Sequence, residues 1–166
     1  MEKSNIANRM KLYENLESGR YFIPLLPIIA RMDGRSFHSF TKHMDRPYDI
    51  KMMQCMQNTT KELVKETNAL IGYTQSDEIT LVWLSTNIKS QVFFDGKIQK
   101  MTSHLSALTT LHFYKNIQQL YPEYANRFPT FDARTWQVPN RQEAVNCLIW
   151  RQQDAVRNSI NMLGQA

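Results

Sequence analysis

The sequence has little cysteine and no apolar segment long enough to cross a membrane. Its two cysteines, Cys55 and Cys147, are too few and too far apart for a disulfide framework or a CxxC metal site. The longest apolar run, residues 22–30, contains two prolines and falls short of the roughly 20 residues of a membrane-spanning helix. Internal repeats and low-complexity tracts are absent too. These absences favour a cytoplasmic or other intracellular protein that does not enter a membrane.

Several catalytic motifs are also missing. The chain has no GxxxxGK[ST] loop and no GxGxxG fingerprint, so P-loop and Rossmann mechanisms have no support. Its four histidines form no HExxH pattern, and no GxSxG elbow is present, which argues against zinc and serine hydrolase chemistry.

The composition is that of a folded domain with a basic surface. Hydrophobic residues make up 42% of the 166 residues and charged residues 21%, which is typical of a globular protein. At this length we expect a single domain over residues 1–166. The net charge of +5 tilts the expectation weakly toward a polyanionic partner.

Hydrophobic periodicity predicts an N-terminal helix over residues 1–20, ended by Gly19, and then the order β-α-β-β-α-β-α. The predicted elements are a strand at 27–32, a helix at 50–70, a hairpin at 71–84, a helix from Lys97, a strand at 130–138 and a final helix at 140–166. A further short strand is expected at 91–94. The first six elements favour an α+β, ferredoxin-like antiparallel sheet with two helices packed on one face. Polymerase palms and nucleotide cyclases place two carboxylates on such a scaffold.

The final helix has an apolar and a polar stripe. Its apolar residues are expected to face inward: Val145, Leu148, Ile149, Val156, Ile160 and Leu163. Arg151, Asp154 and Asn158 form the polar stripe. The amphipathic pattern continues almost to the last residue, so we expect this sequence to be the N-terminal portion of a longer protein.

Two acidic turns are the main candidates for chemistry. Asp33-Gly34 follows a predicted buried strand, and Asp77-Glu78 lies at the predicted hairpin. In the expected sheet these turns are neighbours, and two carboxylates with a backbone carbonyl suit Mg²⁺. Ordinary turn residues are the competing interpretation, because Asp-Gly turns are common.

A basic helix face is a second candidate site. Lys97, Lys100 and His104 share one side of a predicted helix and could hold a triphosphate, although such a stripe is more often a solvated surface. His38, just after the Asp33 turn, is by itself more often a structural residue than a ligand.

Four motifs carry a resemblance to a known family. They are Arg31-Met-Asp-Gly-Arg-Ser-Phe-His-Ser-Phe40, Tyr73-Thr-Gln-Ser-Asp-Glu78, Lys97-Ile-Gln-Lys-Met-Thr-Ser103 and Trp150-Arg-Gln-Gln-Asp154. Together, and in this order, they resemble the tRNA-His guanylyltransferase superfamily of 3′-to-5′ RNA polymerases. The resemblance implies a polymerase-palm domain that uses Mg²⁺, with two ions expected, and ATP and GTP as substrates at the 5′ end of a tRNA.

The resemblance also implies roles for particular residues. Asp33, Asp77 and, as a weaker candidate, Glu78 would be catalytic, with Asp33, Gly34 and Asp77 holding the metal. The implied nucleotide-binding residues are Arg35, Ser36, Phe37, His38, Thr41, Asp49, Ser76, Lys97 and Lys100. The implied RNA-binding residues are Arg151, Asp154 and Asn158.

One departure indicates a subgroup. The His-Ile-Asn-Asn-Leu-Tyr-Asn-like stretch of true tRNA-His guanylyltransferases reads Val156-Arg-Asn-Ser-Ile-Asn-Met162 here, without the histidine. This resembles the like-protein branch, which repairs 5′-truncated tRNAs by templated addition. A tRNA-His guanylyltransferase proper, a palm-type nucleotide cyclase and a non-catalytic module that binds nucleoside triphosphates or RNA are the alternatives. The family forms tetramers, so a homo-oligomer is possible, although the chain is shorter than family members.

Overall fold

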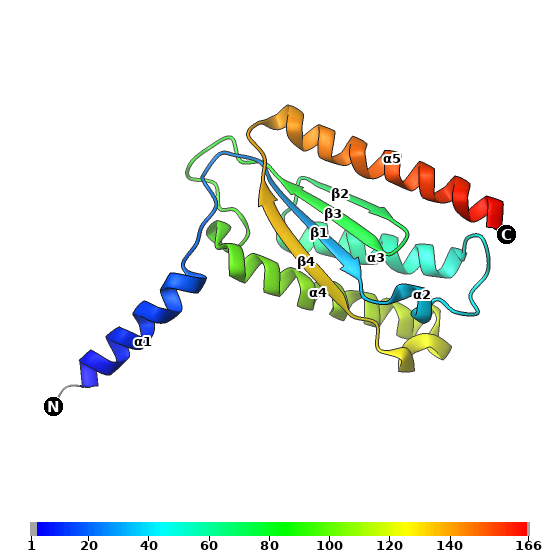
Figure 1. Ribbon diagram of the computed structural model, residues 1–166, viewed down its shortest axis with the longest axis horizontal. Coiled ribbons are helices and arrows are strands. Elements are labelled where there is room, and N and C mark those ends of the chain that lie inside the picture. Colours follow the sequence, from blue (N-terminus) through cyan, green and yellow to red (C-terminus); the bar gives the residue numbers. More distant parts are fainter. Residues whose placement is uncertain (1–2, 166) are drawn as a thin grey trace.

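Four segments rich in β-branched and aromatic residues pair into one antiparallel sheet (Figure 1). They are β1 (Ile28–Gly34), β2 (Ile71–Gln75), β3 (Glu78–Trp83) and β4 (Phe131–Gln137), in the order β2-β3-β1-β4. This is a computed structural model, and it describes residues 3–165, so residues 1, 2 and 166 of the expected terminal helices lie outside it. The strand order confirms the predicted α+β, ferredoxin-like fold.

Two long helices cover one face of this sheet (Figure 1). α3 (Ile50–Thr67) and α4 (Ile98–Leu120) bury Leu63 and Leu105 against Ala30 and Met32 of β1. These side chains are 0% exposed, so the main hydrophobic core lies between the sheet and this helix pair. The prediction of two helices on one face is confirmed.

The second face of the sheet changes from apolar to acidic along its length. Ile29 of β1 and Val82 of β3 form its apolar end and contact α5 (Arg141–Gln165). Alternate residues of a strand point to the same face. Arg31 and then Asp33 therefore follow Ile29 on this face, which the final helix only partly covers.

The inward face of α5 differs from the prediction. Ala144, Cys147 and Leu148 pack on the sheet and Arg151 is 7% exposed, whereas the apolar residues expected to face inward are mostly exposed. Those exposed residues are Val145, Ile149, Val156, Ile160 and Leu163. The reason is the sheet beneath the helix, whose apolar row is short and gives way to charged residues that require a polar partner.

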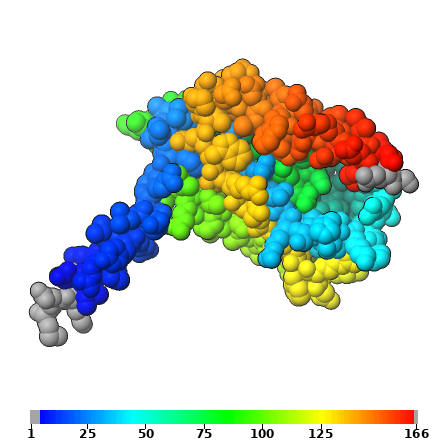
Figure 2. Space-filling model, in the orientation of Figure 1, coloured from blue at the N-terminus to red at the C-terminus, as the bar shows by residue number. Residues whose placement is uncertain are grey.

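The remaining elements are a projecting helix and three short turns of helix. α1 (Lys3–Ser18) extends away from the sheet, as Figures 1 and 2 show, and its described side chains from Asn5 to Glu17 are exposed. α2 (Phe37–Phe40) follows β1, and η2 (Pro122–Arg127) follows α4. Within residues 3–165, no helix combines the length and the apolar character needed to cross a bilayer.

The strand predicted at residues 91–94 does not form. The segment contains η1 (Phe93–Gly96), in which Phe94, Asp95 and Gly96 all adopt positive φ angles. Phe93 stacks on Trp83 at a ring separation of 6.4 Å, which places its side chain against the core. The aromatic residues that suggested a strand are therefore used for packing after a tight turn.

Candidate active site

Two turns bring Asp33 and Asp77 to one corner of the sheet. Asp33 is the penultimate residue of β1 and pairs with Glu78, the first residue of β3. Asp77 lies in the tight turn between β2 and β3. The backbone amide of Gly34 donates a hydrogen bond of 3.1 Å to the carbonyl of Asp77, which ties the two turns together. The two acidic turns that were predicted to be neighbours are therefore neighbours in the structure.

The Asp77 carboxyl lies in an environment that disfavours its negative charge. Burial raises its pKa, a hydrogen bond from Ser76 lowers it, and the charge of Asp33 raises it further, so that the net shift is upward. The Ser76 hydroxyl donates to Asp77 Oδ1 at 2.9 Å. Ser76 is itself in a left-handed conformation, with φ of 48°. A cation beside the two aspartates would relieve this unfavourable charge.

The donor set at this corner fits magnesium. None of the ion pairs formed within residues 3–165 involves Asp33 or Asp77. No group of three or more His, Cys, Asp or Glu side chains in the same range is arranged as a metal site. An ion here would therefore take two carboxylates and complete its shell with backbone carbonyl, water and phosphate oxygens, which Mg²⁺ accepts.

Glu78 is not available as a third free carboxylate. Arg151 of α5 binds both of its oxygens, with Nε to Oε1 at 2.7 Å and Nη2 to Oε2 at 2.8 Å. Glu78 is 7% exposed, so the pair is buried. Both oxygens of Glu78 are thus bound to Arg151, and the catalytic role suggested for Glu78 stays a prediction.

The loop after Asp33 combines exposed polar residues with a buried aromatic anchor. Arg35, Ser36 and His38 are exposed in the segment that directly follows Asp33 and Gly34. Phe37 is buried, and its ring lies 5.0 Å from that of Phe131. Its side chain cannot serve the expected nucleotide-binding role, because it forms part of the core.

Gly34 is required by the same anchor. A Cβ added at this position would overlap the ring of Phe37, which is held among other aromatic rings of the core. The strand can therefore turn toward α2 only with glycine here. The turn that carries Asp33 and the adjoining core thus depend on the same few residues.

Thr41 and Asp49 are used for local structure. The Thr41 hydroxyl donates to the carbonyl of Phe37 at 2.8 Å. Asp49 is the N-cap of α3: Oδ1 accepts from the Met52 amide at 2.9 Å, and Oδ2 accepts from the Tyr121 hydroxyl at 2.9 Å. Burial would raise the pKa of Asp49, but these hydrogen bonds outweigh it and leave the pKa lowered. Both carboxylate oxygens of Asp49 thus serve the fold, and the nucleotide-binding role expected for Asp49 stays a prediction.

Lys97 and Lys100 lie at the other end of the sheet. Lys97 forms a β-bridge with Tyr21, which precedes β1, and Figure 1 shows α4 starting far from the Gly34 end of β1. Lys100 Nζ is 5.1 Å from the centre of the Phe94 ring. Within one chain, the structure places these lysines away from the carboxylates, and the triphosphate role expected for them stays a prediction.

The three polar residues expected on the surface of α5 have different surroundings. Arg151 is buried with Glu78, and its Nη2 also donates to Asp154 Oδ2 at 2.9 Å. Asp154 additionally accepts from Arg157 at 2.8 Å. Asn158 is exposed, and its contact with RNA stays a prediction.

Asp132 is a neighbour of the site that the sequence did not reveal. It pairs with Asp33 across β1 and β4 and is exposed, with Arg134 Nη2 at 3.6 Å from its Oδ1. The strand containing it was predicted, but its register against β1 was not. Only that register places Asp132, a further acidic residue, beside Asp33.

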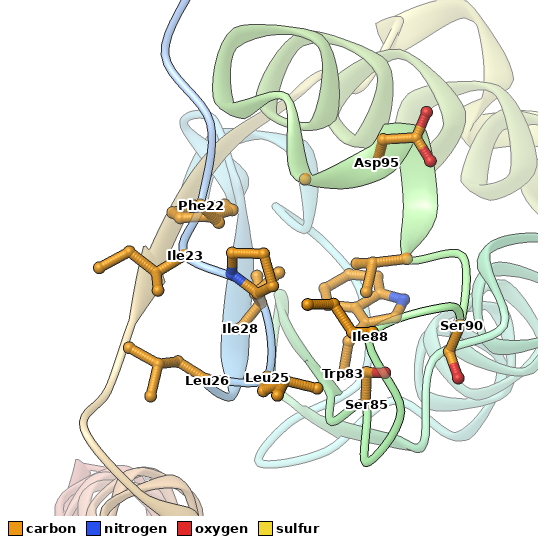
Figure 3. A pocket seen from close by; sticks show the side chains of 13 residues that line it. Phe22, Ile23, Leu25, Leu26, Ile28, Trp83, Ser85, Ile88, Ser90 and Asp95 are labelled. Atoms are coloured by element: carbon orange, nitrogen blue, oxygen red, sulfur yellow. The ribbon is translucent and has the colours of Figure 1, made fainter.

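A small apolar cavity lies far from these carboxylates. Its volume is about 150 Å³, and Figure 3 shows Phe22, Leu25, Ile28, Trp83 and Ile88 around it. These residues flank the start of β1 and the end of β3, whereas Asp33 lies at the end of β1. The cavity is therefore separate from the candidate active site.

The family model described as tRNAHis guanylyltransferase (Thg1) matches residues 7–139, which include both aspartates. The chain belongs to this family. It is 30% identical over 154 residues to the tRNA(His) guanylyltransferase of Schizosaccharomyces pombe, covering 91% of this chain and 56% of that protein. An uncharacterized protein of Acanthamoeba polyphaga mimivirus is also 30% identical, over 191 residues, covering 96% of this chain and 63% of that protein.

Solved structures of the family share the fold. A bacterial tRNA(His) guanylyltransferase (Thg1)-like protein in complex with GTP superposes with a TM-score of 0.90 at 34% identity, covering 98% of this chain and 76% of that one. The tRNA(His) guanylyltransferase of Saccharomyces cerevisiae gives a TM-score of 0.72 at 27% identity, covering 81% of this chain and 60% of that one. The chain spans less than two thirds of the length of the curated relatives described above.

Proposed function

We propose that this chain is a Mg²⁺-dependent nucleotidyltransferase that adds nucleotides in the 3′-to-5′ direction to the 5′ end of tRNA, as templated repair of truncated tRNA. The observation that carries the proposal is the pair Asp33 and Asp77, which have no ion-pair partner within residues 3–165 and lie on two turns joined by a hydrogen bond. The similarity to a bacterial family member in complex with GTP, and to one in complex with ATP, supports nucleoside triphosphates as substrates.

In the proposed reaction, the two aspartates and the loop that follows Asp33 have different roles. The 3′-hydroxyl of an incoming nucleotide attacks an activated 5′ phosphate of the RNA, the hydroxyl proton is lost, and the activating group leaves. Magnesium held by Asp33 and Asp77 would lower the pKa of the hydroxyl and neutralise charge on the leaving group. Arg35, Ser36 and His38, exposed on the adjoining loop, would bind the nucleotide.

The direct test uses the full 166-residue chain with Mg²⁺, ATP, labelled GTP and a 5′-monophosphorylated tRNA that lacks its first nucleotide. We expect the missing nucleotide to be restored and to match the opposing base. A product formed without regard to the opposing base would contradict templated repair. Nucleotide binding without any product would instead support a non-catalytic module, and a cyclic nucleotide formed without RNA would support a cyclase.

A tRNA-His guanylyltransferase proper is the second candidate. It is favoured by the curated relatives that carry this name, including the Schizosaccharomyces pombe protein. The two functions are separated by substrate, because a guanylyltransferase extends a full-length tRNA-His that lacks only its additional 5′ guanosine. Faster turnover of that tRNA than of the truncated one would favour this candidate. Both functions use tRNA and nucleoside triphosphates, so we propose an intracellular location, while a homo-oligomer stays a prediction.

A further inference from the structure

Glu78 and Arg151 form the most completely bonded ion pair at the corner of the sheet. The guanidinium of Arg151 contacts both carboxylate oxygens of Glu78, at 2.7 and 2.8 Å, and both residues are 7% exposed. The Nε of a second guanidinium, that of Arg31 in β1, lies 3.8 Å from Oε2 of Glu78 and has no hydrogen-bond partner within residues 3–165. The hydrogen bonds to the Glu78 carboxylate therefore come from the final helix, and the sheet adds the more distant charge of Arg31.

The pair belongs to a short series of alternating charges on α5. Arg151 Nη2 donates to Asp154, which in turn accepts from Arg157. The Arg151 guanidinium also lies 4.4 Å from the centre of the Trp150 ring. Burial by itself would lower the pKa of Arg151, but the hydrogen bonds and charges of Glu78 and Asp154 raise it, so Arg151 stays charged.

The position of this pair matters because Glu78 directly follows Asp77 and lies opposite Asp33. Asp33, Asp77 and Glu78 thus lie close together in the strand pairing at this corner, and among these three, within residues 3–165, only Glu78 has an ion-pair partner. Asp132, exposed beside Asp33, is paired with Arg134. Without Arg151, Glu78 would keep only the more distant guanidinium of Arg31, at 3.8 Å, and the net negative charge beside the two aspartates would increase. More negative charge there would change which cations the corner binds and would repel a triphosphate.

We propose that Arg151 is a positioning residue of the nucleotide site, which holds Glu78 as a neutralised anchor and leaves Asp33 and Asp77 as the free carboxylates. The proposal rests on the proposed function. It assigns Arg151 a role other than direct RNA contact, because its donors toward the sheet are already bound to Glu78 and Asp154. Through the contact between Arg151 and Glu78, α5 is bonded directly to the residue that follows Asp77.

The test measures binding of Mn²⁺ alone, as a spectroscopic substitute for Mg²⁺, to the full chain at pH 8. We expect Arg151→Gln to tighten Mn²⁺ binding by about tenfold, because it removes a positive charge from the corner. Glu78→Gln should weaken binding by about tenfold, because an excess positive charge remains. The double variant Glu78→Gln/Arg151→Gln should return to within about threefold of the wild type.

A purely structural ion pair gives a different result. Both single variants would then loosen the same turn and weaken Mn²⁺ binding in the same direction, and the double variant would show no rescue; this outcome overturns the proposal. Asp95→Asn, which removes a charge in the distant η1 turn, is the matched control and should leave Mn²⁺ binding unchanged. Thermal denaturation shows whether each variant is folded.

Two further outcomes keep the two proposals separate. If Asp33→Asn binds Mn²⁺ as tightly as the wild type, the metal site itself is wrong, and the role of Arg151 falls with it. If Asp33→Asn loses Mn²⁺ binding but the single variants at Glu78 and Arg151 both shift the Mn²⁺ affinity in the same direction, only the role of Arg151 is wrong.

If Arg151→Gln does not fold, Glu78→Gln decides, because unchanged or tighter Mn²⁺ binding in that variant overturns the proposal.

Discussion

Gly34 donates its backbone amide to the carbonyl of Asp77 at 3.1 Å, so the two acidic turns are joined by the main chain itself. The carboxylates therefore depend on backbone geometry that a substitution at Gly34 would disturb. A substitution that changes the backbone at this corner is therefore expected to change the positions of both carboxylates.

Gly34→Ala should destabilise the protein and reduce activity together. The added Cβ overlaps the Phe37 ring, which cannot move freely among Phe40, Phe113 and Phe131. We expect a loss of about 1–3 kcal/mol in the free energy of unfolding, measured by urea denaturation. Gly164→Ala is the matched control, because a Cβ there meets no atom within 4 Å. Equal stability of the two variants would contradict the packing argument.

Asp33→Asn and Asp77→Asn should each reduce nucleotide transfer by a factor of about 10³ or more, because each removes a charge proposed to hold magnesium. The shape of the side chain is retained, so the melting temperature should stay close to that of the wild type. The measurement is the rate of nucleotide addition under saturating substrates. Asp95→Asn serves as the control with full activity, and retained activity in either site variant would argue against the two-carboxylate site.

Asp49 should stabilise the protein in a pH-dependent manner. Asp49→Ala removes the N-cap of α3 and the partner of Tyr121, at a cost of about 1–2 kcal/mol at pH 7. The pKa of Asp49 is lowered in the folded state. Its contribution is therefore fully present above the ordinary aspartate pKa of 3.8 and is lost as the pH falls through the lower, folded-state value.

The measurement for Asp49 is urea denaturation of the wild type and the variant from pH 7 downward. The difference between the two proteins should be constant from pH 7 to about 5 and should shrink at lower pH. A difference that increased on acidification would contradict the sign of the pKa shift. Glu123→Ala, at an exposed position in η2, should show no such pH-dependent difference.

The two cysteines should react differently with thiol reagents. Burial, followed by the charge of Asp49, raises the pKa of Cys55 to about 11, and its side chain is 0% exposed. Cys147 is only half-buried. We expect one thiol per chain to react with an aromatic disulfide at pH 8 in the native state and two after unfolding. Cys147→Ser should have no reactive native thiol, and reaction of Cys55 at the native rate of Cys147 would contradict this prediction.

The elements of the fold and the two aspartates could be predicted because their signals are local. A buried apolar strand followed by Asp33-Gly34, and a hairpin with Asp77 in its turn, can be recognised from neighbouring residues alone. The likeness of four motifs to one family predicted the same corner. The short strand expected at 91–94 was wrong, because aromatic residues packed from a 3₁₀ turn give the same local pattern as a strand.

Partners across the fold could not be predicted, because they depend on register and on which side of a helix meets the sheet. Asp132 reaches Asp33 only through the register of β4 against β1. Lys97 and Lys100 lie at the start of α4, which is at the end of the sheet opposite to Asp33. Phe37 has a polar neighbourhood in the sequence, yet its ring lies in the core.

The sequence by itself determined the four strands of the sheet, the long helices and the presence of two acidic turns, since these follow from short-range periodicity and turn chemistry. Only the tertiary structure decided that Glu78 is neutralised, because its partner Arg151 comes from a helix that begins after the last strand. A buried carboxylate needs a counter-charge wherever the chain can supply one. That requirement overrode the apolar pattern of α5 and placed an arginine between the final helix and the sheet.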